Sequence, residues 1–269
     1  MGSKGLLLAL LLAAPAGAEE LLRHPYWTEA RPVVGSTAPV NGITTGETLE
    51  YDIYWGLLYV GKSFIRVDSE VAIASRTAWH IVSEAKSASV LNAVYKVDDR
   101  NESWMDTGDF SSHGYYRKLS EGHYFYNEWA VFDLPGRRFY GQKMNRKRET
   151  SSFEGPLDRP VSDYLSAVFR LRLMRIAPGE KLELDVNSKK NWRLTVTAGK
   201  REKISTPYGK RKCVLLEPKT GEESLFVSKA GRRMLIWITD DELKLPMMLK
   251  AEIFIGSVTA KLVRRTVTP

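Results

Sequence analysis

The stretch from Pro160 to Ile176 constrains the fold most, because it is the only long helical signal in a chain of strand-like segments. At about 100° per residue, its apolar side chains cover well over half of the helix circumference. A helix that is apolar nearly all round is buried on most sides. Pro160 is a start signal and Pro178-Gly179 is a stop signal. We therefore expect a helix near residues 160–176 that is cradled by a curved sheet.

Arg172 interrupts this apolar arc, since it projects between the directions of Val161 and Leu165. A buried guanidinium needs hydrogen-bonding partners, because an unpaired buried charge costs several kcal/mol. One hypothesis is a buried ion pair, and the other is a side chain that extends to the domain surface. The candidate partners come from other recognisable sequence blocks and are Asp98, Asp99, Glu102 and Asp241.

From Gly46 onward, apolar and polar residues alternate as they do in half-buried antiparallel strands. Segments of this kind recur about every ten residues to the end of the chain, with turn residues between them. We predict a mainly β protein with one domain at residues 46–269. Its curved antiparallel sheet or incomplete barrel would have about a dozen strands, wrapped on one main helix.

The N-terminal residues 1–18 have the pattern of a secretory signal peptide. Lys4 precedes an apolar run that is too short to span a bilayer, and Ala16-Gly17-Ala18 forms a small-residue cleavage site. We expect an exported, soluble mature chain without a transmembrane span, located in the periplasm of a Gram-negative bacterium. Residues 19–45 contain three prolines and predict an extended lead-in that packs on the domain through Tyr26 and Trp27.

The charge of the chain favours anionic surfaces, because 40 basic residues oppose 32 acidic ones and give a net charge of +8. Phospholipid headgroups, lipopolysaccharide and acidic glycans all fit this excess. Most basic residues occur in short clusters at predicted turns, so we expect a solvated basic rim. Export argues against nucleic acid as a partner.

Sequence motifs for catalysis, metal binding or cofactor binding are missing. The four histidines are isolated, and no H-E-x-x-H, C-x-x-C, G-x-S-x-G or phosphate-loop spacing occurs. The single cysteine, Cys213, lies between strand-like residues and is expected to be a buried small hydrophobe. We predict no cofactor and no metal. We favour an exported binding protein over an enzyme. An enzyme acting on envelope glycan is the weaker alternative.

Aromatic residues crowd the first half of the chain. Aromatic walls suit an apolar ligand, although strands favour aromatic residues in any case. Core filling and a ligand cavity therefore remain alternative interpretations. The residues proposed to bind a ligand are Tyr51, Trp55, Trp79, Tyr95, Trp104, Phe169 and Arg172.

An ordered set of short motifs resembles a bacterial exported family called domain of unknown function 3108. The motifs are G-E-T-L-E-Y-D-I-Y-W-G and Y-V-G-K-S within 46–63, D-D-R-N-E-S-W-M-D at 98–106, S-D-Y-L-S-A-V-F-R-L-R at 162–172, T-P-Y-G at 206–209, I-W-I-T-D-D-E-L-K-L-P at 236–246 and G-S-V-T-A-K-L at 256–262. The resemblance implies an exported bacterial protein, since members of that family are exported and come mostly from Gram-negative bacteria. It implies no established activity and no catalytic residues. By analogy, a curved sheet wrapped on a helix is similar to the periplasmic lipoprotein carriers, and fold alone does not fix function.

Two functional hypotheses follow from these patterns. The first is a non-enzymatic envelope protein whose curved sheet binds an apolar or amphipathic, lipid-like ligand. The second is a structural or interaction protein that holds an envelope protein or glycan through its basic rim.

Overall fold

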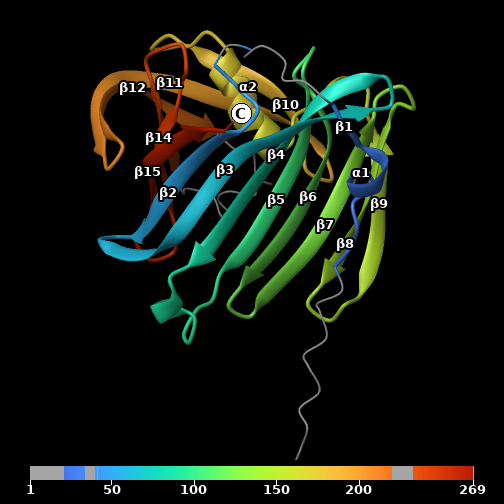
Figure 1. The fold of residues 1–269 in the computed structure, drawn as a ribbon, viewed down its shortest axis with the longest axis horizontal. Helices are drawn as coiled ribbons and strands as arrows, with labels where there is room; N and C mark the ends of the chain where they lie inside the picture. Colours follow the sequence, from blue (N-terminus) through green and yellow to red (C-terminus); the bar gives the residue numbers. More distant parts are fainter. Residues whose placement is uncertain (1–20, 34–39, 41, 220–232, 269) are drawn as a thin grey trace, which may run out of the picture.

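The computed structural model describes residues 21–33, 40, 42–219 and 233–268. The predicted signal peptide, residues 1–18, lies outside these residues. Within the described residues the chain is mainly β, with fifteen strands in a single sheet (Figure 1). The strands are β1 (Arg31–Pro32), β2 (Glu47–Trp55), β3 (Leu58–Ile73), β4 (Arg76–Ser87), β5 (Asp98–Asp106), β6 (Ser112–Glu121), β7 (Tyr124–Asp133), β8 (Arg138–Asn145), β9 (Thr150–Pro156), β10 (Lys181–Asn187), β11 (Asn191–Thr206), β12 (Gly209–Lys219), β13 (Met234–Thr239), β14 (Pro246–Glu252) and β15 (Ser257–Val267).

The sheet is antiparallel and curved, and it is not closed into a barrel. Its path runs from β10 in order to β15, then through β2 in order to β9, while β1 pairs with β3. Pairing of β15 with β2 joins the two halves of the chain into one surface. Strands β10 and β9 are the two edges. The predicted mainly β, antiparallel, open architecture is therefore confirmed.

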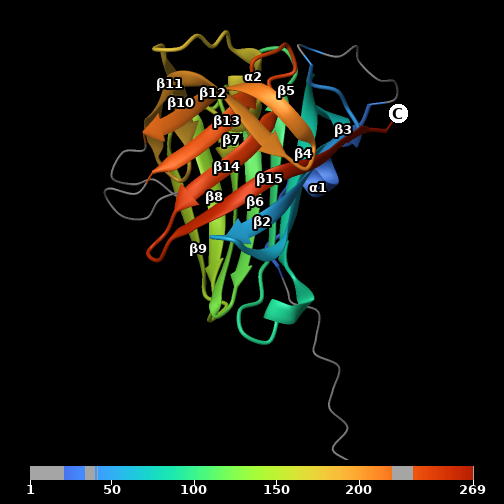
Figure 2. The same ribbon diagram turned by 90° about the vertical axis from the view of Figure 1, so that its left-hand side faces the viewer.

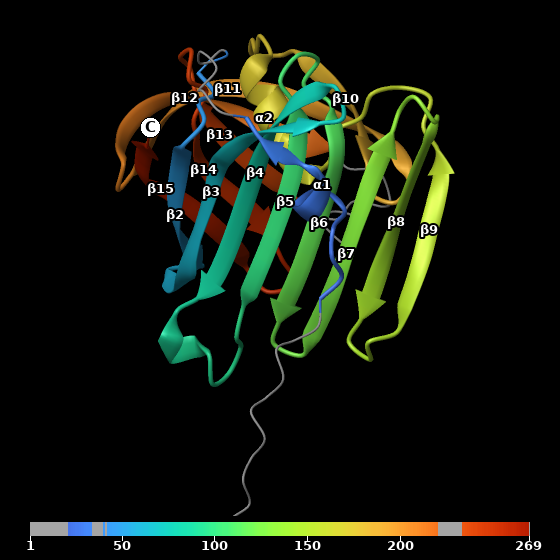
Figure 3. The same ribbon diagram turned by 45° about the vertical axis from the view of Figure 1, so that its right-hand side comes forward.

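We name the two ends of the sheet by their turns. The lower end carries the β2–β3, β4–β5, β6–β7, β8–β9 and β14–β15 connections, and the upper end carries the β3–β4, β5–β6 and β7–β8 turns (Figure 1). The concave face is the one that holds helix α2 (Tyr164–Leu173), and the opposite face is convex (Figures 1 and 3).

Helix α2 is shorter than the predicted helix at residues 160–176. It begins at Tyr164 because Asp163, in an extended conformation, caps it and forms a capping box with Ser166. It ends before Met174, which is also extended. No residue from 161 to 174 is exposed, so the broad apolar arc does correspond to a helix enclosed on most sides. The other described helices are short: α1 (Tyr26–Glu29) and the 3-10 helix η1 (Ser89–Leu91).

The segment before α2 connects the two ends of the sheet path. The backbone nitrogen of Ser112, at the start of β6, donates to the Val161 oxygen at 2.8 Å. The next residue, Ser162, forms two backbone hydrogen bonds with β10, to Asp185 and from Asn187. Helix α2 then packs against β4, β5 and β10 inside the curve of the sheet (Figures 2 and 3). The helix therefore spans the interior from one wall to the other.

The main core lies between α2 and these walls. Ala167 and Leu171 share a buried cluster with apolar residues of β10 to β13. Phe169 lies in another cluster, with Trp79 of β4 and Met105 of β5. Successive helix positions contact opposite walls, so α2 fills the upper part of the concave side (Figure 1). Among the described residues, no helix has the length and apolar character needed to cross a membrane.

Residues 21–33 cover part of the convex face. Tyr26 packs against the cluster that contains Trp104 and Tyr116, and the Trp27 ring meets Tyr116 edge-on at 4.6 Å between centroids. The Trp27 Nε1 also donates to Glu102 Oε2 at 2.9 Å. Tyr26 and Trp27, the residues expected to hold the lead-in, thus both contact the sheet.

Candidate functional site

Arg172 is buried and paired with an acid that the sequence did not suggest. Its side chain is 1% exposed, and its Nη1 lies 2.7 Å from Oε2 of Glu47, the first residue of β2. The guanidinium also donates to the backbone oxygens of Leu243 and Gly42. The same Glu47 accepts from Arg265 Nε at 2.7 Å. The hypothesis of a buried ion pair is therefore correct, and the hypothesis of a surface side chain is wrong.

The four partners proposed for Arg172 were wrong because each has a local role elsewhere. Asp98 pairs with Lys118, and Asp99 accepts from the Ser120 backbone. Glu102 points to the convex face, where it pairs with other side chains, and Asp241 accepts from the Leu243 and Lys244 backbone. Glu47 lies 125 residues from Arg172 in the sequence, and only the sheet pairing brings the two together.

The N-terminus of α2 is held by buried polar residues. Asp163, 1% exposed, accepts hydrogen bonds from the Leu165 and Ser166 backbone, from the Ser166 hydroxyl and from Ser103 Oγ at 2.5 Å. Burial raises the pKa of the Asp163 carboxyl, although these hydrogen bonds oppose the shift. This contact fixes the start of α2 on β5.

The aromatic residues proposed as a binding surface do not form one wall. Trp79 and Phe169 share a buried cluster, and Tyr51 lies near Arg172 with its hydroxyl donating to the Pro246 oxygen. The other three lie elsewhere: Trp104 is buried on the convex face against His24, and Trp55 and Tyr95 are 46% and 53% exposed at the lower end.

The separation of Trp79 and Trp104 has a simple cause. Trp79 stands opposite Met105, and Trp104 stands opposite His80. Since neighbouring residues in a strand point to opposite faces, the two tryptophans lie on opposite sides of the sheet.

A band of polar residues crosses the concave face directly below α2. The row above it contains Ser103, which binds the N-terminus of α2, and Tyr115, whose ring contacts Tyr164 of the helix. The next row down takes one residue from each of seven adjacent strands. We call it the concave row: Ile65, Ser83, Asn101, Arg117, Glu128, Lys143 and Ser151.

Glu128 is the buried centre of this row. It is 0% exposed and accepts hydrogen bonds from Tyr115 at 3.2 Å and Tyr126 at 2.5 Å. Lys189, in the β10–β11 turn, lies 3.3 Å from Glu128 Oε2 and donates to the Tyr126 hydroxyl at 2.8 Å. Burial raises the pKa of both tyrosines, so the two phenols stay protonated donors. Lys189 thus connects the β10–β11 turn to β7 across the concave side of the sheet.

Arg117 and Lys143 flank Glu128 on the two neighbouring strands. Both are partly buried, and neither forms an ion pair with any residue that the structure describes. The Arg117 guanidinium lies over the Tyr164 ring at 5.2 Å. With Lys189, three cations lie around Glu128, and Arg117 also interacts electrostatically with Asp99 of β5. The sequence reasoning missed these residues, although Arg117 shares the strand alternation of the buried Tyr115.

The opposite part of the concave face is apolar. Leu249 of β14 and Met234 of β13 pack against the cluster that includes Ala167 and Leu171 of α2. Ile65, at the β3 end of the concave row, contacts the clusters on both sides of this wall. Below α2 the concave face therefore joins an apolar wall to a cationic one.

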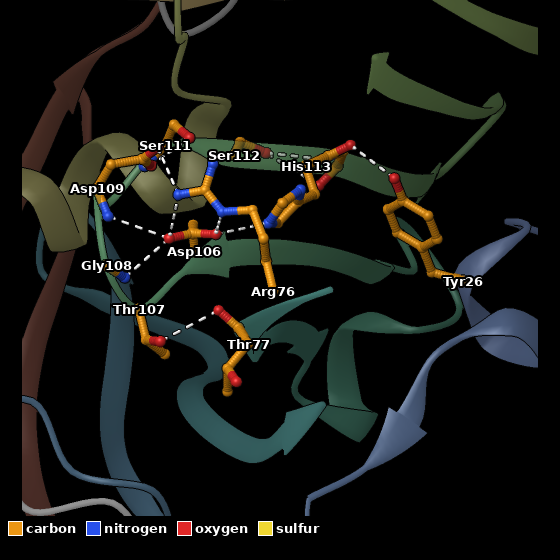
Figure 4. A network of polar contacts seen from close by, with 11 residues as sticks. Tyr26, Arg76, Thr77, Asp106, Thr107, Gly108, Asp109, Ser111, Ser112 and His113 are labelled. Carbon is orange, nitrogen blue, oxygen red and sulfur yellow. Dashed lines mark hydrogen bonds and ion pairs between the residues drawn. The ribbon is translucent and has the colours of Figure 1, made fainter. Parts of the chain in front are cut away.

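A second polar cluster lies at the upper end, beside a pocket of about 590 Å³ (Figure 4). Asp106, 2% exposed, pairs with Arg76 at 2.7 Å and with His113 at 2.9 Å. The backbone nitrogens of Gly108 and Asp109 donate to the same carboxylate. Burial alone would raise the pKa of Asp106, but the hydrogen bonds, led by that from His113, lower it to about 2. Every polar atom of this carboxylate is used to hold the β5–β6 turn, which indicates a structural role.

A third cluster holds residues 21–33 on the convex face. The His24 ring stacks on the Trp104 ring with 4.2 Å between centroids. The His80 ring stacks on the same indole with 5.0 Å between centroids. His24 Nε2 donates to the Ala130 oxygen at 3.1 Å, and its Nδ1 accepts from the Tyr26 backbone at 3.0 Å. Burial lowers the pKa of His24 to about 3. Because Nδ1 faces a donor, this contact requires the neutral ring.

Metal and thiol chemistry find no support among the described residues. No group of three or more His, Cys, Asp or Glu side chains in the described part of the chain could hold a metal ion. Cys213 is buried, and burial raises the pKa of its thiol to about 11. A thiol of this kind is protonated at neutral pH and is a poor nucleophile.

One solved structure supports the curved β architecture of the chain. A beta-barrel-like protein of domain of unknown function DUF1849 from Brucella abortus superposes with a TM-score of 0.51 at 9% identity, over 84% of this chain and 99% of that chain. A protein with a YmcC-like fold from Bacteroides fragilis gives a TM-score of 0.35 at 9% identity, over 83% of this chain and 97% of that chain. At 9% identity the likeness to the Brucella abortus protein concerns the fold alone.

Comparison with curated proteins finds no relative. A family model does match, over residues 50–263 and therefore over most of the chain. This range includes every strand from β3 to β14, helix α2 and the whole concave row. The chain belongs to the family described as protein of unknown function DUF3108.

Proposed function

We propose that this protein binds an anionic amphiphile on the concave face below α2. The observation that carries the proposal is the pair Arg117 and Lys143, two partly buried cations that form no ion pair with the described residues. Unpaired cations in a partly desolvated site are costly unless a ligand supplies the opposite charge. The concave row leads from these cations, through Asn101 and Ser83, to Ile65 at the apolar wall. A ligand with an acidic headgroup and an acyl or alkyl chain matches both surfaces.

The polar side of this site suits a carboxylate or phosphate headgroup. Arg117 offers a planar fork of donors, and Lys143 offers a compact cation on the far side of Glu128. The Tyr115 and Tyr126 hydroxyls are committed to Glu128, and Lys189 is committed to the same acid. Glu128 pairs with Lys189, whereas Arg117 and Lys143 form no ion pair among the described residues. The chemistry is recognition without bond breaking, because no nucleophile and base are placed together there.

The signal-peptide pattern of residues 1–18 supports an exported protein that acts in the periplasm. Phospholipids, free fatty acids and lipid-modified proteins are the anionic amphiphiles available in an envelope. We therefore propose a non-enzymatic periplasmic protein that shields such a ligand from water. The shared chemistry is an acidic headgroup attached to an alkyl chain.

A titration with a fluorescent fatty acid tests this proposal. The double variant Arg117→Gln/Lys143→Gln should weaken binding by about tenfold or more, because charge-assisted hydrogen bonds to the headgroup are lost. Lys62→Gln is the matched control, since Lys62 is exposed on β3 between the concave-facing Gly61 and Ser63 positions. The wild type should bind an uncharged monoacylglycerol probe more weakly than it binds the fatty acid. The wild type and the double variant should bind this uncharged probe with equal affinity. Equal losses in the control and the double variant would refute the proposal.

The alternative, an interaction protein that uses its basic rim, makes a different prediction. In that case no amphiphile binds, and cross-linking recovers an envelope protein or glycan. Its binding would weaken with salt, because exposed charges are screened within about 10 Å at 0.1 M. The Arg146, Lys147 and Arg148 turn at the lower end is the part of the rim that favours this alternative.

A further inference from the structure

Exposed apolar side chains gather at the lower end of the sheet. Eleven of the thirteen large hydrophobic residues that are exposed among the described residues lie in or directly beside four connections at this end. We call this set the apolar ridge: Trp55, Leu57, Leu58, Tyr59, Val90, Val94, Tyr95, Tyr124, Ile253, Phe254 and Ile255. Leu57 is 99% exposed, and Val94 and Phe254 are 86% and 85% exposed. Soluble proteins seldom expose apolar side chains so fully and so close together, unless that surface binds a partner or a membrane.

The four connections touch one another and form a continuous ridge. The Trp55 indole donates to the Ile255 oxygen at 2.8 Å, which joins the β2–β3 and β14–β15 turns. The Ala88 backbone donates to Val60, which joins the β4–β5 connection to β3. The Gly122 backbone donates to Lys96 at 2.7 Å, and the Tyr95 ring lies against the same glycine. The ridge therefore runs along adjacent hairpins from β14 to β7.

Positive charge adjoins the apolar ridge. The β8–β9 turn is the next hairpin along this end and carries Arg146, Lys147 and Arg148, all exposed. The Arg148 guanidinium lies over the Phe125 ring at 5.2 Å, beside the ridge residue Tyr124. Lys96 is exposed within the ridge itself. Apolar side chains bordered by arginine and lysine match the hydrocarbon boundary and the phosphates of an anionic bilayer.

We propose that the apolar ridge docks this protein onto the surface of an anionic phospholipid bilayer. Projecting turns suit a deformable lipid surface, because they enter it individually and need no matching groove. Trp55, Tyr95 and Tyr124 are amphipathic rings of the kind that settle at headgroup level. The inference goes beyond the proposed function, since the ridge and the concave row share no residue. It orients the open lower part of the concave face toward the membrane (Figure 3).

Flotation with vesicles of phosphatidylglycerol and phosphatidylcholine tests the ridge. The wild type should float with mixed vesicles, and Leu57→Ser/Phe254→Ser should reduce the bound fraction at least about tenfold, because two apolar side chains no longer enter the lipid. Val267→Ser is the matched control, since Val267 is 43% exposed at the opposite end of β15. Both substituted ridge residues are exposed, so circular dichroism should match the wild type.

Two further measurements separate the outcomes. Arg146→Gln/Lys147→Gln should reduce floating with phosphatidylglycerol vesicles and weaken its dependence on salt, because charged headgroups attract these residues. The ridge variant should still bind the fluorescent fatty acid, so failure of docking and failure of the ligand site are distinguishable. Wild type that stays at the bottom with every vesicle composition would overturn the proposal. So would a ridge variant that floats as well as the wild type.

Discussion

The closed half and the open half of this sheet treat polar groups in opposite ways. In the closed half, where α2 covers the concave face and residues 21–33 cover the convex face, buried charges are matched by named partners. Glu47 pairs with Arg172, and Asp106 pairs with Arg76 and His113. In the open half, below α2, Arg117 and Lys143 form no ion pair among the described residues.

The difference separates what holds the fold from what is available for binding. A charge that accepts several fixed hydrogen bonds is already satisfied, and it gains little from a ligand. A partly buried cation without a partner gains most when a ligand arrives. The polar cluster of Figure 4 looks like a catalytic constellation at first sight, yet its groups are fully used in holding a turn. The less conspicuous concave row is the better candidate site.

Breaking the buried ion pair should have the largest effect. Glu47→Gln leaves the Arg172 guanidinium in a site where both side chains are 1% exposed. Removal of one partner of a buried pair costs about 3–5 kcal/mol, so urea denaturation should show a loss of unfolding free energy of this size. Arg172→Met should cost less, because Glu47 would keep Arg265 as a partner.

The control for this prediction lies on the same strand. Glu50→Gln breaks the pair between Glu50 and Arg264, whose side chains are 30% and 63% exposed. Exposed pairs contribute at most about 1 kcal/mol. Equal losses for Glu47→Gln and Glu50→Gln would remove the distinction between buried and exposed pairs.

The pH dependence of His24 should have the next largest effect. Its folded pKa of about 3 lies below the ordinary value of 6.5, so the unfolded chain takes up a proton first as the pH falls. The stability contributed by the neutral His24 is complete above the unfolded value, and it is lost as the pH falls from 6.5 toward 3. His24→Phe keeps the stacking and cannot titrate. Its unfolding free energy should fall less, by about 2 kcal/mol, than that of the wild type between pH 7 and pH 5.

Comparison of the two proteins at each pH isolates this group. Asp99 has a folded pKa raised to about 7 by burial, so its contribution has the opposite sign in the same range. It is present in both proteins and cancels from their difference. A wild type and a His24→Phe variant with identical pH profiles would contradict the neutral-ring requirement at Trp104.

Neutralising the open half should have the smallest effect on stability. Arg117→Gln/Lys143→Gln removes two cations that form no ion pair among the described residues, so the unfolding free energy should change by less than about 1 kcal/mol, or rise. Chemical denaturation without ligand measures it. A loss as large as that of Glu47→Gln would mean that these cations support the fold rather than a ligand.

The fold could be predicted from the sequence further than the site. Strand alternation identified a mainly β, antiparallel, open sheet, and the apolar arc of residues 160–176 identified a helix enclosed by it. The predicted helix was too long at both ends. The helix begins after Asp163 and ends before Met174, because both residues have extended conformations that apolar periodicity does not report.

The site could not be predicted because it depends on pairing across strands. Alternation within one strand tells which residues share a face, but it does not tell which face meets which in the next strand. The opposite placement of Trp79 and Trp104 follows only from the register of β4 with β5. Likewise, Arg117, Glu128 and Lys143 become neighbours only through two further registers. A charged residue that shares the alternation of buried aromatics, as Arg117 does with Tyr115, is the signal that could have pointed to the row.

A crystal structure of the protein with dodecyl phosphate tests the central claim most directly. The account predicts the phosphate in contact with the Arg117 and Lys143 side chains, with the alkyl chain directed along the concave row toward Ile65. Density for the phosphate elsewhere, with the Arg117 and Lys143 side chains unchanged and the concave face filled by water, would contradict it.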